Sequence, residues 1–495
     1  MFPSNPFTHR LGVHQLAGRV LIILLIVFSA PSAFSWDAFW TQGGFEFERG
    51  TEIAIDEDGN VYVAGWAEIA ATGDNNLVII KYNNLGVQQW DYVYDGGLHS
   101  VLGVDEPVGI GFDASGNVYT GGKSRFERSG LQDYDFLTIK LNVNGVHQWT
   151  RLYDYTNGNN PHGDDTATDM KVDSSGNVWI TGDSEGEYLT VKYNSAGVEQ
   201  WAKRYNDDNP SGNHIATAIA IDSQGNSYVT GYSMDADAAY QYGTIKYSSA
   251  GGKIWDSRYG GGAPYGYKPW AIAVDGSGNV AVTGIRIDHS DADWSDIVTV
   301  HYSSNGVQSW AKIFAGTGYD GTYHDEGNAV DFDTGGNVYV AGYATMSGNS
   351  TDYIVLKYSP NGVQQWMEHY NEVPGSAGTG DSSDRAYDLT VDGAGQVYVV
   401  GELDVDWGGV ALDQTYGIVT YSTEGTVLDV QYFDGDPAYP LEDQALAVAV
   451  NNVGDVAVTG AANGSTTFDD IGTTVIVSDG SLFSDGFESG NLGAW

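Results

Sequence analysis

The chain has 495 residues, with 21 Lys+Arg against 65 Asp+Glu, a formal net charge of -44, and no Cys. This acidity excludes general binding to nucleic acid, because the protein has few cations that could replace the counterions of phosphate. The absence of Cys excludes disulfides and thiolate metal sites, and the 67 Gly and 13% aromatic residues favour a turn-rich, packed protein.

The first 35 residues have the pattern of an export signal. Arg10 and Arg19 precede an uncharged apolar run at 20–28, which is too short to span a bilayer. Small residues follow, and a cleavage site of the expected type falls just before Trp36. We therefore predict a signal peptide at 1–35 and a secreted bacterial protein, located outside the cell, on its surface or in the periplasm. The mature protein is not expected to insert into a membrane; an uncleaved anchor is the alternative.

One sequence unit recurs eight times along the rest of the chain. Its first part has the pattern A-x-D-x-x-G-N-x-Y-V-x-G, with apolar alternation on both sides of a Gly-Asn turn. This pattern predicts two antiparallel strands joined by a tight turn. The lead position of the hairpin holds Asp56, Asp113, Asp173, Asp222, Asp275, Asp333, Asp392 and Asn451.

Each unit continues with a second predicted hairpin. In six units a Trp falls four residues after the turn Gly, and unit seven has Asp429 in its place. These are Trp90, Trp149, Trp201, Trp255, Trp310 and Trp366. No segment has a helical period, so each unit predicts four strands, here called A to D. Tandem four-stranded units of this size predict a β-propeller.

The two ends of the repeat predict how the ring closes. The last unit lacks a Trp-bearing strand D, and the segment from Trp36 to Trp40 has the aromatic spacing of that strand. If the N-terminal strand completes the last blade, the ring has no open sheet edge. We therefore predict an all-β propeller of eight four-stranded blades over 36–478, with seven blades as the alternative, followed by a tail at 479–495.

The two hairpin motifs together resemble the SBBP-type β-propeller repeat of secreted bacterial proteins. The resemblance covers 36–478 and implies secretion and a binding or structural role. The family name implies seven blades, so eight would be a departure. The tail, which contains D-G-F-E-S-G and ends at Trp495, is similar to a terminus of other exported bacterial proteins. It is interpreted as a sorting or docking tag, with a frayed terminus as the alternative.

In a propeller the A–B and C–D turns lie on one face, and the B–C and D–A loops lie on the other. The turns are uniformly short in this chain, whereas the loops vary widely in length. Variable loops on a rigid scaffold are where binding residues usually occur. We therefore expect the functional residues on the variable-loop face.

The position eight residues before each lead residue is mostly acidic. Six units have a carboxylate there, and His214 and Tyr267 fill the other two. Carboxylate oxygens suit Ca²⁺, so these residues predict a cation site around the channel mouth. The alternative is that each side chain caps N–H groups of its own loop. The six are Glu48, Asp105, Asp165, Asp325, Asp384 and Asp443.

Two further sets of loop residues are candidates for binding. The B–C loop of unit five concentrates carboxylates that a Ca²⁺ ion would neutralise, with a solvated loop as the alternative. These are Asp288, Asp291, Asp293 and Asp296. Aromatic side chains in two D–A loops are suited to stacking on sugar rings or a peptide, although Trp270 also fits a core position. These are Tyr265, Tyr267, Trp270, Tyr319 and Tyr323.

The predicted function is a binding or surface-interaction module, assisted by Ca²⁺ and acting as a monomer on extracellular protein or polysaccharide. No catalytic residue is identified. The alternative is an extracellular carbohydrate-active hydrolase or lyase, which a cleft with two carboxyl groups roughly 5–10 Å apart and shifted pKa values would favour. A third interpretation is a quinone-dependent dehydrogenase, because the Trp hairpin is also similar to the tryptophan-docking motif of eight-bladed quinoproteins. The adjacent Cys pair common in that family is missing.

Overall fold

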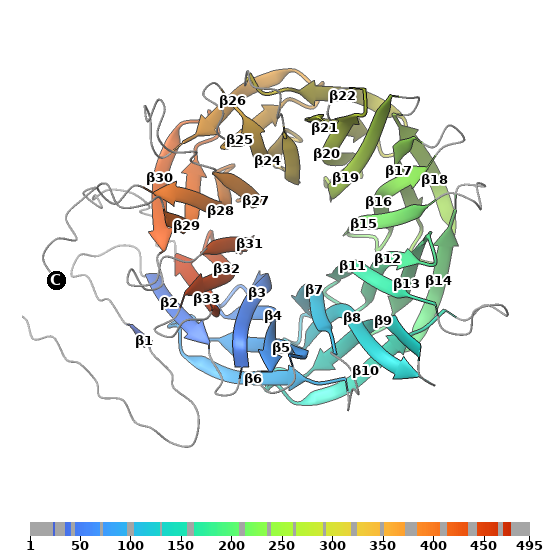
Figure 1. The fold of residues 1–495 in the computed structure, drawn as a ribbon, viewed down its shortest axis with the longest axis vertical. Helices are drawn as coiled ribbons and strands as arrows, with labels where there is room; N and C mark the ends of the chain where they lie inside the picture. Colours follow the sequence, from blue (N-terminus) through green and yellow to red (C-terminus); the bar gives the residue numbers. More distant parts are fainter. Residues whose placement is uncertain are drawn as a thin grey trace, which may run out of the picture.

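The computed structural model forms a closed ring of eight antiparallel sheets arranged around one axis (Figure 1). It describes residues 23–24, 35–40, 45–69, 73–96, 103–128, 131–155, 163–206, 213–234, 239–260, 264–290, 294–317, 324–346, 351–371, 384–405, 413–433, 443–463 and 469–476. These residues contain no helix, and therefore none that could cross a membrane. The predicted all-β propeller of eight blades is confirmed.

The first four blades use consecutive strands, ordered from the centre of the ring outward. Blade 1 has β3 (Phe45–Ile55), β4 (Val61–Ile69), β5 (Asn75–Tyr82) and β6 (Gln88–Tyr94). Blade 2 has β7 (Asp105–Phe112), β8 (Val118–Arg128), β9 (Leu131–Leu141) and β10 (His147–Tyr153). Blade 3 has β11 (Asp165–Val172), β12 (Val178–Ser184), β13 (Glu187–Tyr193) and β14 (Glu199–Tyr205). Blade 4 has β15 (His214–Ile221), β16 (Ser227–Met234), β17 (Tyr240–Tyr247) and β18 (Lys253–Tyr259).

The next three blades repeat this order, and the eighth differs. Blade 5 has β19 (Tyr265–Val274), β20 (Val280–Asp288), β21 (Trp294–Tyr302) and β22 (Gln308–Phe314). Blade 6 has β23 (Glu326–Phe332), β24 (Val338–Thr345), β25 (Thr351–Tyr358) and β26 (Gln364–Tyr370). Blade 7 has β27 (Arg385–Val391), β28 (Val397–Val405), β29 (Asp413–Tyr421) and β30 (Val427–Phe433). Blade 8 has β31 (Gln444–Val450), β32 (Val456–Asn463), β33 (Asp469–Ile476) and β2 (Ser35–Trp40).

The N-terminal strand closes the ring as predicted. β2 pairs antiparallel with β33, from Ser35 opposite Ile476 to Trp40 opposite Ile471. The two-residue strand β1 (Ile23–Leu24), which falls within the predicted signal peptide, adds to the outer edge of β2. The rest of that peptide and the tail at 479–495 lie outside the described residues, so both stay predictions.

The A–B turn of blade 2 shows how the repeated Asp forms each hairpin. Asp113 Oδ1 accepts the N–H groups of Ser115 at 2.9 Å and Asn117 at 3.0 Å, and the hydroxyl of Tyr119 donates to Oδ2 at 2.9 Å. Gly116 has a φ of 74°, which is strained for residues with a Cβ. Burial alone would raise the pKa of Asp113, but the hydrogen bonds from Asn117, Tyr119 and Ser115 outweigh it and lower that pKa.

The hydrophobic core lies between neighbouring blades. Tyr62, Leu77 and Ile79 of blade 1, for example, pack in one buried cluster with Leu137 and Ile139 of blade 2. Strands B and C are therefore covered on both faces, which is why they are apolar almost without interruption. The packed ring positions every loop and turn on a rigid scaffold.

The Trp of strand D in each of blades 1 to 6 docks on the C–D turn of the next blade. Trp149 Nε1 donates to the carbonyl of Ser195 at 3.2 Å, and the indole covers Gly197, whose φ is 72°. The same bond joins five other pairs of blades. Because Gly lacks a Cβ, the indole can lie directly on the backbone of the turn.

The one strand D of blades 1 to 7 that lacks the Trp lies next to the composite blade. Asp429 belongs to blade 7, which is followed by the composite blade 8. In blade 8, strands C and D come from different parts of the chain and are not joined by a turn. The residues that follow Ile476, where the other blades have their C–D turn, lie outside the described residues.

Candidate functional site

The six carboxylates predicted around the channel mouth lie at or near the start of the innermost strands and are buried, with exposures of 0–3%. Asp105 Oδ2 accepts the N–H of Gly96 at 2.8 Å. Asp325 accepts the N–H groups of Gly316 at 2.5 Å and Thr345 at 2.8 Å. These bonds tie the start of strand A to the D–A loop and to the end of strand B. They perform the loop-capping role that was the alternative, and the cation site at these residues stays a prediction.

Two of these carboxyl groups have raised pKa values. Asp165 accepts the N–H of Tyr155 at 2.5 Å, and burial raises its pKa to about 6 although that bond and a hydrogen bond with Ser184 oppose the change. Burial likewise raises the pKa of Asp325 to about 6. In both cases the loss of hydration outweighs the hydrogen bonds that favour the anion.

The carboxylates predicted in the B–C loop of blade 5 are only partly within the described residues. Asp288 accepts the N–H and the hydroxyl of Ser290 at 2.9 and 2.6 Å, and these bonds lower the pKa of Asp288. Asp296 forms an ion pair with Arg286. Asp291 and Asp293 lie outside the described residues, so the structure does not test this group as a whole.

The predicted aromatic residues do not form one surface within the described part of the chain. Tyr267 is buried and packs against Tyr242 and Tyr259, with ring centroids 6.4 and 5.6 Å away. The guanidinium of Arg286 lies 4.8 Å from the ring centroid of Tyr265. Trp270 is half-buried, and no described residue accepts a hydrogen bond from its buried Nε1. Tyr319 and Tyr323 lie outside the described residues.

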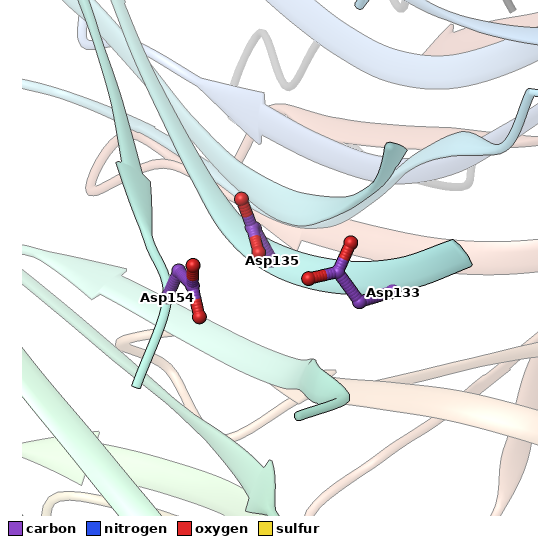
Figure 2. Close-up of side chains that lie close together, drawn as sticks. All are labelled: Asp133, Asp135 and Asp154. Carbon is purple, nitrogen blue, oxygen red and sulfur yellow. The ribbon is translucent and has the colours of Figure 1, made fainter. Parts of the chain in front are cut away.

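A different acidic cluster lies on the variable-loop face of blade 2 (Figure 2). Asp133 and Asp135 belong to the first part of β9, and Asp154 follows the end of β10. One carboxylate oxygen of each residue lies within 4.8 Å of one oxygen of the others, and Asp133 and Asp135 are buried. Oxygens bound to one Ca²⁺ are at most about 5 Å apart, because each lies 2.3–2.6 Å from the ion. Among the described residues, no other group of three such side chains is this close together.

This cluster differs from the same place in blade 3. There Glu187, which corresponds to Asp135, forms an ion pair with Arg204 at 2.7 Å. Blade 2 has Leu152 in the place of that Arg, as the pairing of β9 with β10 shows. The sequence carries a signal for the cluster, because Phe136 pairs with Tyr153 and the next positions of the hairpin are Asp135 and Asp154. The sequence analysis missed it because it compared positions between units and not across the C–D hairpin.

A second cluster lines the central channel. A β-bulge between Ala167 and Asp169 shifts the register of β11, after which Met170 is buried, Asp169 is half-buried and Lys171 is exposed. Lys171 Nζ lies 2.8 Å from Asp169 Oδ1. Glu52 of blade 1 lies within electrostatic reach of both, and of Asp388 of blade 7. Blades 1, 3 and 7 are not neighbours, so these electrostatic interactions reach across the inner side of the ring.

The carboxyl groups of this channel cluster have strongly shifted pKa values. Burial raises the pKa of Glu52 to about 8, and Lys171 opposes that change. Burial also raises the pKa of Asp388 to about 7, against hydrogen bonds from the N–H groups of Val448 at 2.9 Å and Leu389 at 2.8 Å. The sequence carries a signal for this group, because Glu52, Asp169 and Asp388 each lie four residues before the lead Asp of their unit, where the other five units have Gly or Ala. The sequence analysis did not examine that position.

One comparison with known protein families matches part of the repeat. The family model described as SBBP, beta-propeller repeat, matches residues 200–235, which span strand D of blade 3 and strands A and B of blade 4. This match confirms the resemblance for that segment. A search of curated proteins finds no match.

Solved structures similar to this chain include a β-propeller domain, a WD40 domain and a polysaccharide lyase. The WD40 domain of SCAP from fission yeast is 10% identical and has a TM-score of 0.42, with 88% of this chain and 97% of that chain covered. The β-propeller domain of the trilobed protease from Pyrococcus furiosus is 8% identical and has a TM-score of 0.41, with coverage of 76% and 96%. The polysaccharide lyase Uly1 is 10% identical and has a TM-score of 0.42, with coverage of 89% and 91%. The eight-bladed fold itself follows from the strand order of this chain.

Proposed function

We propose that this chain is an exported β-propeller that binds extracellular protein or polysaccharide through its variable-loop face, with Ca²⁺ held by Asp133, Asp135 and Asp154. The observation that carries the proposal is the convergence of these three carboxylates at the loop end of blade 2. Three buried or half-buried anions at this separation repel one another, and a divalent cation would offset that repulsion.

A bound cation would act on the loop face through the chain segments that provide its ligands. Asp133 and Asp135 lie near the start of strand C, and Asp154 begins the D–A loop that leads to Asp165 in blade 3. Ca²⁺ would therefore link two loop attachment points of blade 2 and stabilise the path to the next blade. A loop face ordered in this way presents a preformed surface, which reduces the entropy lost when a partner binds.

The first test is thermal unfolding of the EDTA-treated protein while Ca²⁺ is titrated at constant ionic strength. We expect a saturable rise in Tm of a few degrees, because a ligand at 100 times its Kd adds about 2.7 kcal/mol of stability. Asp135→Asn should abolish the rise. Glu199→Gln removes one charge from an exposed position of blade 3 and should preserve it. An equal rise in both variants, or none in the wild type, would contradict the proposed site.

The second test measures binding to a panel of polysaccharides and purified cell-surface proteins, with Ca²⁺ and with EDTA. We expect a partner whose affinity falls on Ca²⁺ removal and in Asp135→Asn, but not in Glu199→Gln. A partner that binds with equal affinity in Ca²⁺, in EDTA and to both variants would support the binding function but contradict the role of Ca²⁺.

The channel cluster favours a second candidate, an extracellular carbohydrate-active enzyme. Glu52 and Asp388 have pKa values near those that a general acid needs at neutral pH, and Lys171 provides a nearby cation. The test is release of reducing ends or unsaturated products from neutral and uronic-acid polysaccharides. Activity that Glu52→Gln and Asp388→Asn each reduce by about 100-fold or more would support this candidate. Activity unaffected by both variants would contradict it.

A further inference from the structure

A hollow of about 710 Å³ lies between blades 5 and 6 on the face that carries the short A–B and C–D turns. This is the face opposite the variable loops, so the hollow is separate from the proposed Ca²⁺ site. The residues used in the argument below all line it: Asp275, His301, Asp331, Phe332, Asp333 and Pro360. Three of the six are carboxylates.

The corresponding space between blades 4 and 5 is filled by two side chains. The hydroxyl of Tyr228 donates to Asp222 Oδ2 at 3.0 Å. Lys246 Nζ lies 4.6 Å from the centroid of the Tyr228 ring and 3.9 Å from Asp222 Oδ2. An aromatic residue on strand B and a Lys opposite it on strand C occur in the same way in blades 1, 2, 3 and 6.

Blade 5 has lost both of these side chains. Ala281 replaces the aromatic residue, and His301 replaces the Lys that would pair with it across β20 and β21. A methyl group placed on Gly278 would lie 3.2 Å from the Tyr228 hydroxyl and 4.0 Å from Lys246 Nζ. On the equivalent Gly336 of blade 6, its nearest neighbours would be Pro360 Cγ at 3.7 Å and Asp275 Oδ2 at 3.9 Å. Asp275 Oδ2 therefore points into the space between blades 5 and 6 that corresponds to the one filled by Tyr228 and Lys246 between blades 4 and 5.

Blade 5 is the only one of the eight that retains the lead Asp but has neither the aromatic residue on strand B nor the Lys on strand C. Blade 7 has Thr420 in place of Lys but retains Tyr398, whose hydroxyl donates to Asp392 at 3.4 Å. Blade 8 has Ala457 and Val475 in the two positions, and its lead residue is the neutral Asn451. The negative charge is thus retained only in blade 5 when both neighbours are lost.

The hollow also has hydrogen-bond acceptors that a Lys satisfies in other blades. Lys192 Nζ donates to the carbonyl of Ser249 at 3.0 Å, and the same carbonyl accepts the indole N–H of Trp201. In blade 5 the indole N–H of Trp310 donates to the carbonyl of Pro360 at 3.0 Å, but no Lys is present to add the second bond.

The Nδ1 atom of His301 is a further polar atom of the hollow without a hydrogen-bond partner among the described residues. Its side chain is 5% exposed and stacks on Trp310 with centroids 5.1 Å apart, and no described residue bonds to Nδ1. Burial lowers the pKa of His301, and Asp275 opposes that change. The lowered pKa keeps the ring neutral at pH 7, so it adds no cation to the hollow.

We propose that this hollow binds the primary ammonium group of an alkylamine, which takes the place of the Lys side chain in the other blades. Asp275 Oδ2, the Pro360 carbonyl and the His301 imidazole are the acceptors. Asp331 and Asp333 add negative potential, and Phe332 offers apolar surface to the alkyl chain. The amine comes from a free diamine or from a Lys side chain of a partner protein.

The experiment is calorimetric titration of the full chain with 1,5-diaminopentane, and separately with Nα-acetyl-lysine methylamide, in 150 mM NaCl. Tighter binding of the diamine indicates a free amine as the ligand, and tighter binding of the lysine derivative indicates a protein side chain. Pentanol and acetyl-norleucine methylamide are the neutral controls and should not bind. Binding by these neutral compounds at equal affinity, or no saturable binding by either amine, would overturn the proposal.

Variants test whether the hollow is the binding site. Asp275→Asn should weaken binding about ten-fold or more, because it removes the charged acceptor. The double variant Ala281→Tyr with His301→Lys restores the pattern of the other blades and should abolish binding while raising or preserving Tm. Asp222→Asn is the matched control, since its site is already filled by Tyr228 and Lys246, and it should not change the affinity. Equal affinity in the double variant and the wild type would overturn the proposal.

Discussion

The indole of Trp310 and the backbone of Gly362 are in direct contact across the boundary between blades 5 and 6. Gly362 has a φ of 75°, and a Cβ there would lie 2.6 Å from Trp310 Cγ. The bond from Trp310 Nε1 to the carbonyl of Pro360, at 3.0 Å, belongs to the same contact. Each pair of docked blades is thus joined by one aromatic side chain and one residue without a side chain.

This contact predicts that Gly362→Ala destabilises the ring. The substitution adds a clash with the indole and a left-handed backbone strain, so we expect a loss of about 2–4 kcal/mol in the free energy of unfolding, measured by urea denaturation. The control is Gly276→Ala, since a Cβ at Gly276 has no neighbour within 4 Å. A similar loss in both variants would show that the docking contact has no special role.

The lowered pKa of Asp113 predicts a pH-dependent effect in its hairpin. A carboxyl group with a lowered folded-state pKa adds stability above its unfolded pKa, and that stability is lost as the pH falls through the folded value. Asp113→Asn should therefore cost about 1 kcal/mol at pH 7, and its cost should shrink below pH 3.8. Urea unfolding at several pH values measures this difference, and Asp58→Asn, in the exposed turn of blade 1, is the control.

The channel cluster predicts the opposite pH dependence. The pKa of Glu52 is raised to about 8 and that of Asp388 to about 7, so their favourable contribution is complete below the unfolded values near 4.5 and 3.8. It is lost as the pH rises through 7 and 8, where both groups ionise in the folded ring. We expect stability to fall between pH 5 and 9, with a shallower slope in Glu52→Gln. The slope of Glu199→Gln should match the wild type; a wild-type slope in Glu52→Gln would contradict the assignment.

Pairing of the closing strand β2 with β33 predicts that proline substitutions at two neighbouring positions destabilise the ring to different extents. Asp37 and Ala38 pair with Thr474 and Thr473 of β33, and successive N–H groups of a strand point to opposite edges. Of Asp37→Pro and Ala38→Pro, the one that removes an N–H facing β33 should cost about 1–3 kcal/mol more than the other. Thermal unfolding of both variants, with Asp37→Ser and Ala38→Ser as controls, measures the difference. Equal effects would contradict closure through this ladder.

The amino-acid sequence was sufficient to predict the propeller, the number of blades and the closing strand. These features depend on local patterns that recur in each unit, such as the Asp113 turn and the spacing between Gly145 and Trp149. Even the departure at Asp429 is visible in the sequence, and the structure places that residue next to the composite blade 8. Such patterns can be recognised in the sequence because the same turn and docking contacts require the same residue types in successive units.

Alignment of the units found the buried carboxylates at the entry of each blade but not where their oxygens point. Whether Asp325 faces the channel or its own loop depends on how the D–A loop returns across the end of the blade, and that path is not repeated between units. The structure gives its oxygens hydrogen bonds from Gly316 and Thr345. The aligned position of these carboxylates in the repeat therefore did not determine which groups their oxygens face.

The sequence by itself determined the scaffold, because each hairpin folds by contacts between residues near one another in the chain. Only the tertiary structure decided which chemically active groups meet. Ring closure places Glu52, Lys171 and Asp388 within electrostatic reach of one another, hairpin pairing brings Asp135 beside Asp154, and the packing of blade 5 on blade 6 leaves Asp275 facing a hollow. These arrangements depend on distances between side chains of different strands and blades, and the order of residues in the repeat does not give those distances.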